Sequence, residues 1–160
     1  MIPRIGFGYD IHKLATGEEL WLGGIKLDFH LGTVGHSDAD VLIHAICDAL
    51  LGAANLRDIG FHFPDTDPKW KGADSKNLLK GVIQLLLEKG YLVGNVDSTI
   101  VIEQPKINPH ISKMRKILGQ LMNVSEDEVS VKATTSEKLS FVGNEEGIKA
   151  YAVALIYKKI

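Results

Sequence analysis

The chain has 160 residues, of which 45% are hydrophobic and 24% charged, and its formal net charge at pH 7 is −2. This composition is typical of one globular domain covering residues 1–160, and it excludes a disordered chain. Scattered Lys and Arg residues, and apolar stretches shorter than ~20 residues, predict binding to neither nucleic acid nor membrane. The single cysteine, Cys47, excludes an intrachain disulfide. We therefore expect a cytoplasmic protein, or a protein of an organelle stroma if the chain is a mature plastid-type form.

The first half of the chain begins with strand-like sequence and continues into a helix. Residues 4–10 predict a strand, and ELWLGGIKLD (19–28) predicts a hairpin in which Gly23 and Gly24 take the positive φ values of a tight turn. Apolar residues recur at helical spacing over residues 38–54, and Ser37 or Asp38 is the expected helix cap.

The second half alternates helices and strands. Helices are predicted over residues 75–89, ending before Gly90, and over residues 108–122. Strands are predicted over residues 95–102, 129–134 and 149–158. This order predicts an α/β (α+β) fold, in which a mixed β-sheet is covered by helices on one face.

The last predicted strand has no polar face. Three alanines at positions 150, 152 and 154 alternate with Tyr151, Val153 and Leu155. Helices on one side of the sheet leave the other apolar side without a partner, so we expect a homo-oligomer.

Two segments together suggest a metal site. Asp10 and His12 in GYDIH are two residues apart and share one strand face, as a simple hydrogen-bonded pair would also do. On the predicted helix, Asp40, His44 and Asp48 are four residues apart and share a stripe, and the flanking carboxylates favour a fixed tautomer of His44. Asp10, His12 and His44 match a catalytic zinc site with three protein ligands and one open position.

Three loops offer groups that bind phosphate, although each is also typical of an ordinary turn. GHSDAD (35–40) places His36 and Ser37 at a helix entrance, which favours anions. DIGFHFPDTDP (58–68) predicts either a cluster of turns or a loop that covers a ligand. VKATTSEKL (131–139) ends a strand in hydroxyl residues beside Glu137, which suit phosphate and a hard cation. Together they predict diphosphate chemistry.

In order and nearly end to end, these motifs resemble the 2-C-methyl-D-erythritol 2,4-cyclodiphosphate synthase family. The resemblance rests on GYDIH, GHSDADVLIHAICDALLGAANLRDIGFHFPDTDP, KGADS, GNVDSTIVIEQPKINPHI, VKATTSEKLSFVGNEEGI and the closing strand. It implies a homotrimer with its sheets around a three-fold axis and active sites between subunits. It also implies the reaction, in which the 2-phosphate of 4-diphosphocytidyl-2-C-methyl-D-erythritol 2-phosphate attacks the β-phosphorus of the same molecule. The products are CMP and the cyclic diphosphate of the non-mevalonate isoprenoid pathway.

The resemblance also implies roles for single residues. Asp10, His12 and His44 match zinc ligands, and Glu137 matches a ligand of a second ion, Mg²⁺ or Mn²⁺. His36 and Thr135 match positions that stabilise the transition state. The matching substrate-binding positions are Ser37, Asp58, Gly60, Phe63, Asp65, Asp67, Ile102, Lys106, Asn108, Thr134, Ser136 and Phe141.

One position departs from the family pattern. Asn144 in GNEEG stands where relatives often carry an arginine that faces the central cavity of the trimer. Asparagine has no charge and one amide, so we expect no arginine-type grip on an isoprenoid diphosphate in that cavity.

Two other functions fit parts of the pattern. A metal-dependent phosphohydrolase would use a similar metal cluster with water as the nucleophile, although the chain lacks an adjacent His-Asp pair. A non-catalytic nucleotide-binding trimer would hold its zinc with four protein ligands and show no turnover.

Overall fold

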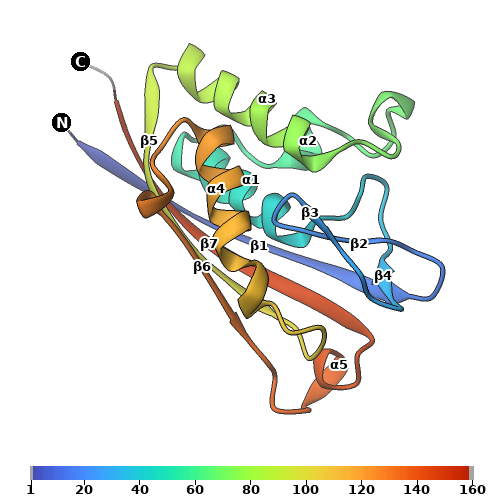
Figure 1. Cartoon of the computed structure of the whole chain (residues 1–160). Coiled ribbons are helices and arrows are strands. Elements are labelled where there is room, and N and C mark those ends of the chain that lie inside the picture. The colour runs from blue at the N-terminus through green and yellow to red at the C-terminus, as the bar shows by residue number, and fades with distance from the viewer. Residues whose placement is uncertain (1, 159–160) are drawn as a thin grey trace.

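The computed structural model describes residues 2–158, and a five-stranded sheet forms one of its layers (Figure 1). The strand order is β4-β1-β7-β5-β6. Neighbouring strands are antiparallel except β5 and β6, which run parallel, so the sheet is mixed as predicted. The strands are β1 Pro3–Ala15, β4 Gly32–Thr33, β5 Tyr91–Val101, β6 Val129–Thr134 and β7 Gly147–Lys158. The predicted hairpin forms a separate pair, β2 Leu20–Leu22 and β3 Ile25–Leu27, with Gly23 and Gly24 at φ values of 60° and 82°.

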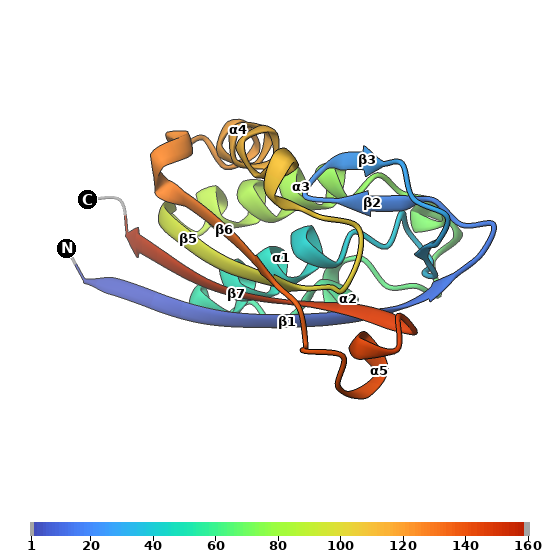
Figure 2. The same cartoon turned by 60° about the horizontal axis from the view of Figure 1, so that its bottom comes forward.

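The three long helices lie together on one face of the sheet (Figures 1 and 2). They are α1 Val41–Ala53, α3 Ser75–Glu88 and α4 Ile111–Met122. Helix α1 packs on β1 and β7, α4 packs against β6, and α3 contacts both α1 and α4. The short helices are α2 Ile59–His62, α5 Ser140–Gly143 and the 3-10 turns η1 Pro68–Trp70, η2 Asn108–His110 and η3 Glu126–Glu128. A mixed sheet with helices on one face is therefore confirmed.

The cap of α1 differs from the prediction. Asp40, rather than Ser37 or Asp38, occupies the cap, and its side chain accepts a hydrogen bond of 3.1 Å from Ile43 N–H. Asp38 bonds instead to the backbone N–H of Ser75. The sequence offered three polar residues before the helix, and only tertiary contacts decide which of them lies at its first turn.

Two glycines let α1 approach β1 closely. A Cβ atom at Gly8 would lie 1.8 Å from the carbonyl oxygen of Ala45, and one at Gly6 would lie 2.0 Å from that of Ala49. Such contacts are far inside van der Waals distance, so the helix backbone rests directly on the strand. Asp10 and His12 occupy the same face of β1 as these glycines, which brings them within reach of α1.

The opposite face of the sheet carries exposed apolar side chains. Ile5 and Phe7 on β1 are 73% and 63% exposed, and Tyr9, Ile11 and Val153 are also exposed. On β7, the alanine side chains at positions 150, 152 and 154 lie on the other face of the sheet and are buried under the helices. The sequence expectation of an apolar sheet face without helical cover is thus confirmed.

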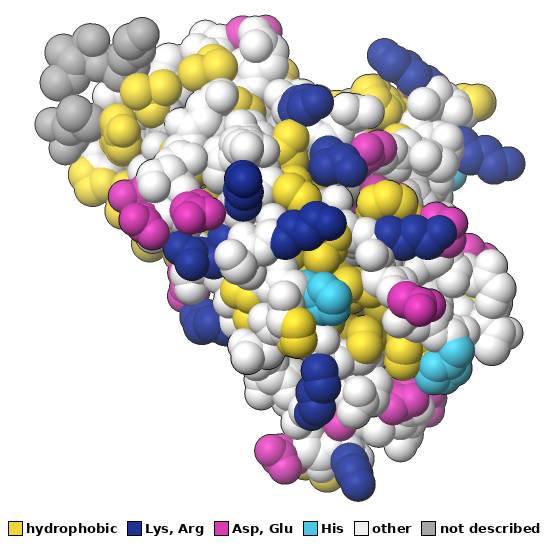
Figure 3. Space-filling view, viewed as in Figure 1, with side chains coloured by type: hydrophobic (Ala, Val, Ile, Leu, Met, Phe, Trp, Pro, Cys, Tyr) yellow, Lys and Arg dark blue, Asp and Glu magenta, His cyan; other side chains and the backbone are white. Residues whose placement is uncertain are grey.

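The face of the molecule seen in Figure 1 is mixed in charge. Figure 3 shows Lys and Arg side chains interspersed with Asp and Glu on the side seen in Figure 1, in keeping with the net charge of −2. Across residues 2–158, the helices all fall short of the length and apolar character that a membrane crossing requires.

Candidate active site

Three ligand-type side chains from β1 and α1 meet above the sheet. Asp10 Oδ2 lies 2.9 Å from His12 Nε2 and 3.0 Å from His44 Nδ1, and the two histidine nitrogens are 3.2 Å apart. Within residues 2–158, these side chains form the single group of three or more His, Cys, Asp or Glu residues whose ligand atoms lie within 4.8 Å of one another. The sequence prediction that strand and helix bring Asp10, His12 and His44 together is confirmed.

The geometry of this triad suits a divalent metal ion. Metal–ligand bonds of about 2.1 Å in a tetrahedral arrangement place ligand atoms about 3.4 Å apart, close to the separations found. His12 Nδ1 lies 2.9 Å from the carbonyl oxygen of Val34, so this nitrogen carries a proton and Nε2 faces the triad. His44 Nε2 lies 2.9 Å from Ser75 Oγ and 3.2 Å from Ser37 Oγ, which leaves Nδ1 facing Asp10. Each ring thus presents one nitrogen to the same point.

Contacts within the triad shift the pKa values of Asp10 and His12. Burial acts to raise the pKa of Asp10, but hydrogen bonds and charge attraction from His12 and His44 outweigh it and lower this pKa from 3.8 to about 2. Burial acts to lower the pKa of His12, and the hydrogen bond and negative charge of Asp10 outweigh it, so that this pKa is raised. Ionised Asp10 is therefore well suited to act as a metal ligand near neutral pH.

Asp40 and Asp48 have contacts other than those the sequence predicted. Asp40 is fully buried, and besides capping α1 it accepts hydrogen bonds of 3.0 and 2.7 Å from the N–H groups of Gly23 and Gly24. Burial raises the pKa of Asp40 despite these donors. Asp48 accepts a hydrogen bond from Ile59 N–H and so anchors α2. These carboxylates fasten neighbouring elements to α1, while Ser75 and Ser37 contact the outer nitrogen of His44.

A hollow of about 330 Å³ opens beside the triad. It collects five further residues predicted for the site, namely His36, Ser37, Gly60, Phe63 and Asp65. His36 Nε2 is buried and has no hydrogen-bond partner among the described residues. Asp58 and Asp67 lie at the N-termini of α2 and η1, outside the lining. The triad and the 36–37 loop thus share one cavity with the 58–68 loop.

Most of the remaining predicted residues lie at the other edge of the sheet, and Phe141 is the exception. Ile102, Lys106, Asn108, Thr134 and Thr135 line a separate hollow of about 180 Å³. The strand register aligns Asp10 with Ala150, Ile100 and Ala133 in turn, so three strand spacings, or about 14 Å, separate β1 from β6. Phe141 lines a third hollow beside His12. One chain therefore keeps the two halves of the predicted site apart.

Comparison with known proteins identifies the family. A model of the YgbB family matches residues 3–157. The chain belongs to the YgbB family. It is 61% identical over 155 residues to the 2-C-methyl-D-erythritol 2,4-cyclodiphosphate synthase of Parabacteroides distasonis, covering 97% of this chain and 96% of that protein. Identity to the synthase of the same name from Phocaeicola vulgatus is 63%, covering 97% of both.

Solved structures agree with this assignment. IspF from Plasmodium falciparum, determined as a CDP complex, matches this YgbB chain with a TM-score of 0.86 and 35% identity. The match covers 99% of this chain and 97% of that one. The resemblance inferred from the motifs is therefore confirmed, and that structure shares the mixed α/β fold of the chain.

Glu103, a residue that the motifs did not single out, holds the turn at residues 136–138 of the YgbB chain. Glu103 Oε1 lies 2.8 Å from Ser136 N and 3.0 Å from Ser136 Oγ, and the N–H of Lys138 donates to the same oxygen. The backbone hydrogen bond from Ser136 N–H, first among these contacts, lowers the pKa of Glu103. Glu137 and Lys138 have φ values of 55° and 59°, so this carboxylate holds a turn that non-glycine residues adopt reluctantly. The sequence alone did not predict that residues 101 and 134 pair in parallel, and this pairing places Glu103 beside Ser136.

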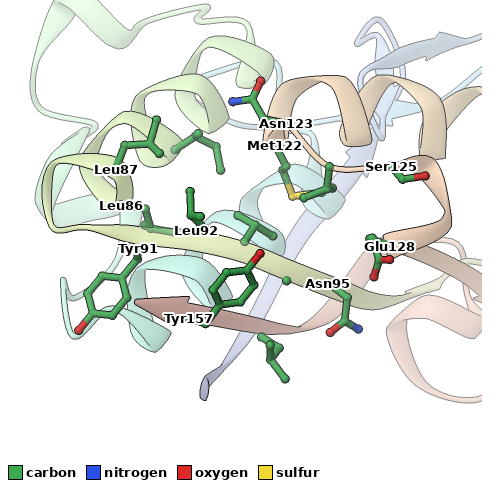
Figure 4. A pocket seen from close by; sticks show the side chains of 15 residues that line it. Leu86, Leu87, Tyr91, Leu92, Asn95, Met122, Asn123, Ser125, Glu128 and Tyr157 are labelled. Atoms are coloured by element: carbon green, nitrogen blue, oxygen red, sulfur yellow. The ribbon is translucent and has the colours of Figure 1, made fainter. Parts of the chain in front are cut away.

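A larger hollow lies away from the triad, at the start of β5. Figure 4 shows Leu86 and Leu87 of α3 and Met122 of α4 around it, with Tyr91 and Tyr157 near the sheet. Its volume is about 630 Å³, and among the described residues Glu128 is the one Asp, Glu, His, Lys or Arg side chain in its lining. This lining lacks the ligand set that the triad provides for a metal-bound phosphate.

Proposed function

We propose that the chain catalyses the intramolecular cyclisation of 4-diphosphocytidyl-2-C-methyl-D-erythritol 2-phosphate. A 2-phosphate oxygen forms a bond to the β-phosphorus, the bond from that phosphorus to the bridging oxygen breaks, and CMP leaves with that oxygen. The observation that carries the proposal is the triad of Asp10, His12 and His44 beside a hollow of about 330 Å³. The identity of about 60% to named synthases along nearly the whole chain supports the same reaction. We also propose that residues 1–160 act as a single domain.

On the triad side, the chain's residues bind and orient the diphosphate. We assign zinc to the triad, where a bound ion would act as a Lewis acid toward the β-phosphate. His36 lines the same cavity, and its ring, whose Nε2 has no partner among the described residues, would hydrogen-bond a phosphate oxygen as charge develops on it. Phe63 and Asp65 line the cavity and would hold the methylerythritol end together with Asp67. Gly60 and Asp58 would contact the ribose side, and Ser37 lines the cavity as a further substrate-binding residue. Both reacting phosphates belong to one molecule, so no protein nucleophile is needed.

On the other side, residues at the ends of β5 and β6 would hold the CDP group. The hollow lined by Ile102, Lys106, Asn108, Thr134 and Thr135 suits the cytidine end. Glu137 follows in the turn held by Glu103 and would hold Mg²⁺ or Mn²⁺, which would supply positive charge to the phosphates of the CDP group. Thr135 would contribute to stabilising the transition state. IspF from Plasmodium falciparum binds CDP, which supports a cytidine site here.

The distance between these halves supports a homotrimer. About 14 Å of sheet separates β1 from β6 in one chain, so residues near Thr135 would complete the site of a neighbouring subunit. The exposed apolar face around Ile5 and Phe7 would be buried between the sheets at the three-fold axis. Asn144 follows α5 near the end of that face, and we propose no arginine-type diphosphate grip there.

The reaction is tested by incubating the protein with the proposed substrate and following the products by phosphorus NMR. The expected result is a cyclic diphosphate together with one equivalent of CMP, abolished by a chelator and restored by Zn²⁺ with Mg²⁺. An open-chain 2,4-bisphosphate, with two phosphomonoester groups in place of the cyclic diphosphate, would indicate water as the nucleophile and thus a phosphohydrolase. CDP binding without turnover would indicate a nucleotide-binding protein.

The trimer is tested by light scattering, which should give three times the chain mass of 17.5 kDa. Phe7→Glu should produce monomers, because it places a charge on the apolar sheet face. Leu87→Glu is the matched control, since Leu87 is 44% exposed on helix α3. It should leave the trimer intact. A monomeric wild-type protein at micromolar concentration would rule out the proposed assembly.

A further inference from the structure

Ser75, in the KGADS motif, lies behind the metal-ligand candidate His44. Its Oγ is 2.9 Å from His44 Nε2, the ring nitrogen that faces away from Asp10, and Ser75 is fully buried. The same hydroxyl donates to Asp38 Oδ1, while the N–H of Ser75 donates to Asp38 Oδ2 at 2.9 Å. A carboxylate, a hydroxyl and an imidazole thus form a continuous chain of contacts that leads to the triad.

The chemistry of these groups fixes the direction of the hydrogen bonds from Asp38 through Ser75 to His44, whose Nε2 also lies 3.2 Å from Ser37 Oγ. An ionised carboxylate only accepts, so the hydroxyl hydrogen of Ser75 points to Asp38. The lone pairs of the hydroxyl then remain to accept a proton from His44 Nε2. A proton on Nε2 leaves the lone pair of Nδ1 directed at Asp10 Oδ2, 3.0 Å away, where a metal would bind.

The backbone on both sides keeps this chain of contacts in place. Asp38 N–H donates to Ala73 O at 3.0 Å, and Gly72 N–H donates to His36 O at 2.7 Å. The N–H of Asp40 also donates to Asp38 Oδ1 at 3.2 Å. The 36–40 loop and the start of α3 are therefore bonded together, and neither Asp38 nor Ser75 can turn away without breaking backbone hydrogen bonds.

We propose that Ser75 and Asp38 are positioning residues that orient His44 and hold its proton on Nε2, so that Nδ1 is presented to a divalent metal ion. The inference deepens the proposed function and rests on its metal centre. Hydrogen-bond partners of metal ligands are typically worth ~10- to 100-fold in metal affinity. The motif KGADS thus serves the metal site rather than only starting helix α3.

The affinity for Zn²⁺ alone, measured by chelator competition without substrate, tests the proposal. Ser75→Ala should bind Zn²⁺ ~10- to 100-fold more weakly than the wild type. Ser98→Ala is the matched control, because Ser98 is also buried. Its hydroxyl donates to Ser130 O on the neighbouring strand β6, away from the triad. It should bind within about threefold of the wild type, since it leaves the partners of His44 untouched. Equal affinities of the two variants would overturn the positioning role.

Two further measurements separate a positioning role from a structural one. In the zinc-loaded wild type, long-range ¹H–¹⁵N NMR should show the proton of His44 on Nε2, and a proton on Nδ1 would overturn the proposal whether or not Ser75→Ala folds. Asp38→Asn with Ser75→Ala should bind Zn²⁺ no more weakly than Ser75→Ala alone, whereas multiplied losses would mean that the two residues act independently. A wild type that binds no zinc would instead refute the metal centre itself.

Discussion

His44→Ala should lose at least ~100-fold in zinc affinity and reduce CMP release to a few per cent of the wild-type rate or less. The variant removes one of three ligand atoms that lie within 3.2 Å of one another, and two ligands hold a metal ion poorly. The fold should survive, because α1 keeps its buried leucines and isoleucines against the sheet. Zinc is measured by elemental analysis, CMP by chromatography and folding by circular dichroism.

Two comparison variants make this result specific. His30→Ala changes an exposed histidine outside the cavity and should keep both zinc and activity. Glu137→Gln should keep its zinc but require more Mg²⁺ or Mn²⁺ for turnover, because it removes a charge at the other edge of the sheet. Full zinc content together with wild-type CMP release in His44→Ala would show that the triad is not the metal site.

Among the proposed variants, Gly8→Ala should show the largest loss in free energy of unfolding. The new Cβ would lie 1.8 Å from Ala45 O and 2.8 Å from Ala49 N, both backbone atoms of α1 that no side-chain rotation can relieve. Overpacking typically costs ~1–3 kcal/mol, and this rigid clash lies at the upper end or beyond. A fall in Tm of roughly 10 °C is expected for a chain of this size. Displacement of α1 from β1 should also separate His44 from Asp10 and weaken zinc binding.

Gly52→Ala provides the control within α1 itself. A Cβ at Gly52 meets nothing within 4 Å, so the same substitution is free of steric cost there. Alanine is favoured over glycine inside a helix by about 1 kcal/mol, and Tm should stay the same or rise slightly. Thermal unfolding followed by circular dichroism compares the two variants. Coincident melting curves for Gly8→Ala and the wild type would contradict the proposed close approach.

Much of the fold follows from local sequence patterns. Turn glycines predicted the hairpin at Gly23–Gly24, strand-forming residues predicted β6 at its observed bounds, and the stop at Gly90 placed α3 to within one residue. Strand β1 extends to Ala15, beyond the predicted Asp10, because β7 and β4 supply partners along its whole length. Pairing between distant strands leaves little trace in either strand alone.

The site was predictable where ligand chemistry requires particular side chains. Aspartate and histidine at a spacing of two on a strand, with a histidine on the next helix, predicted the triad. Ser75 and Glu103 escaped because serine before a helix and glutamate after a strand are common everywhere. Their roles depend on contacts with His44 and Ser136, residues more than 30 positions away in each case. Asp40 and Asp48 shared a helical stripe with His44, but they bond to backbone groups of other elements.

The width of the sheet has a genetic consequence under the proposed trimer. Each active site would combine the triad beside β1 of one chain with the residues at the end of β6 of its neighbour. A chain with a damaged triad would therefore still supply intact β6 residues to a neighbouring site. A chain with a damaged β6 edge likewise still offers its triad. A trimer mixed from two such defective chains would contain an intact site wherever a sound triad meets a sound edge. Two inactive alleles could then complement each other in one cell, while either allele alone would leave the cell without the enzyme.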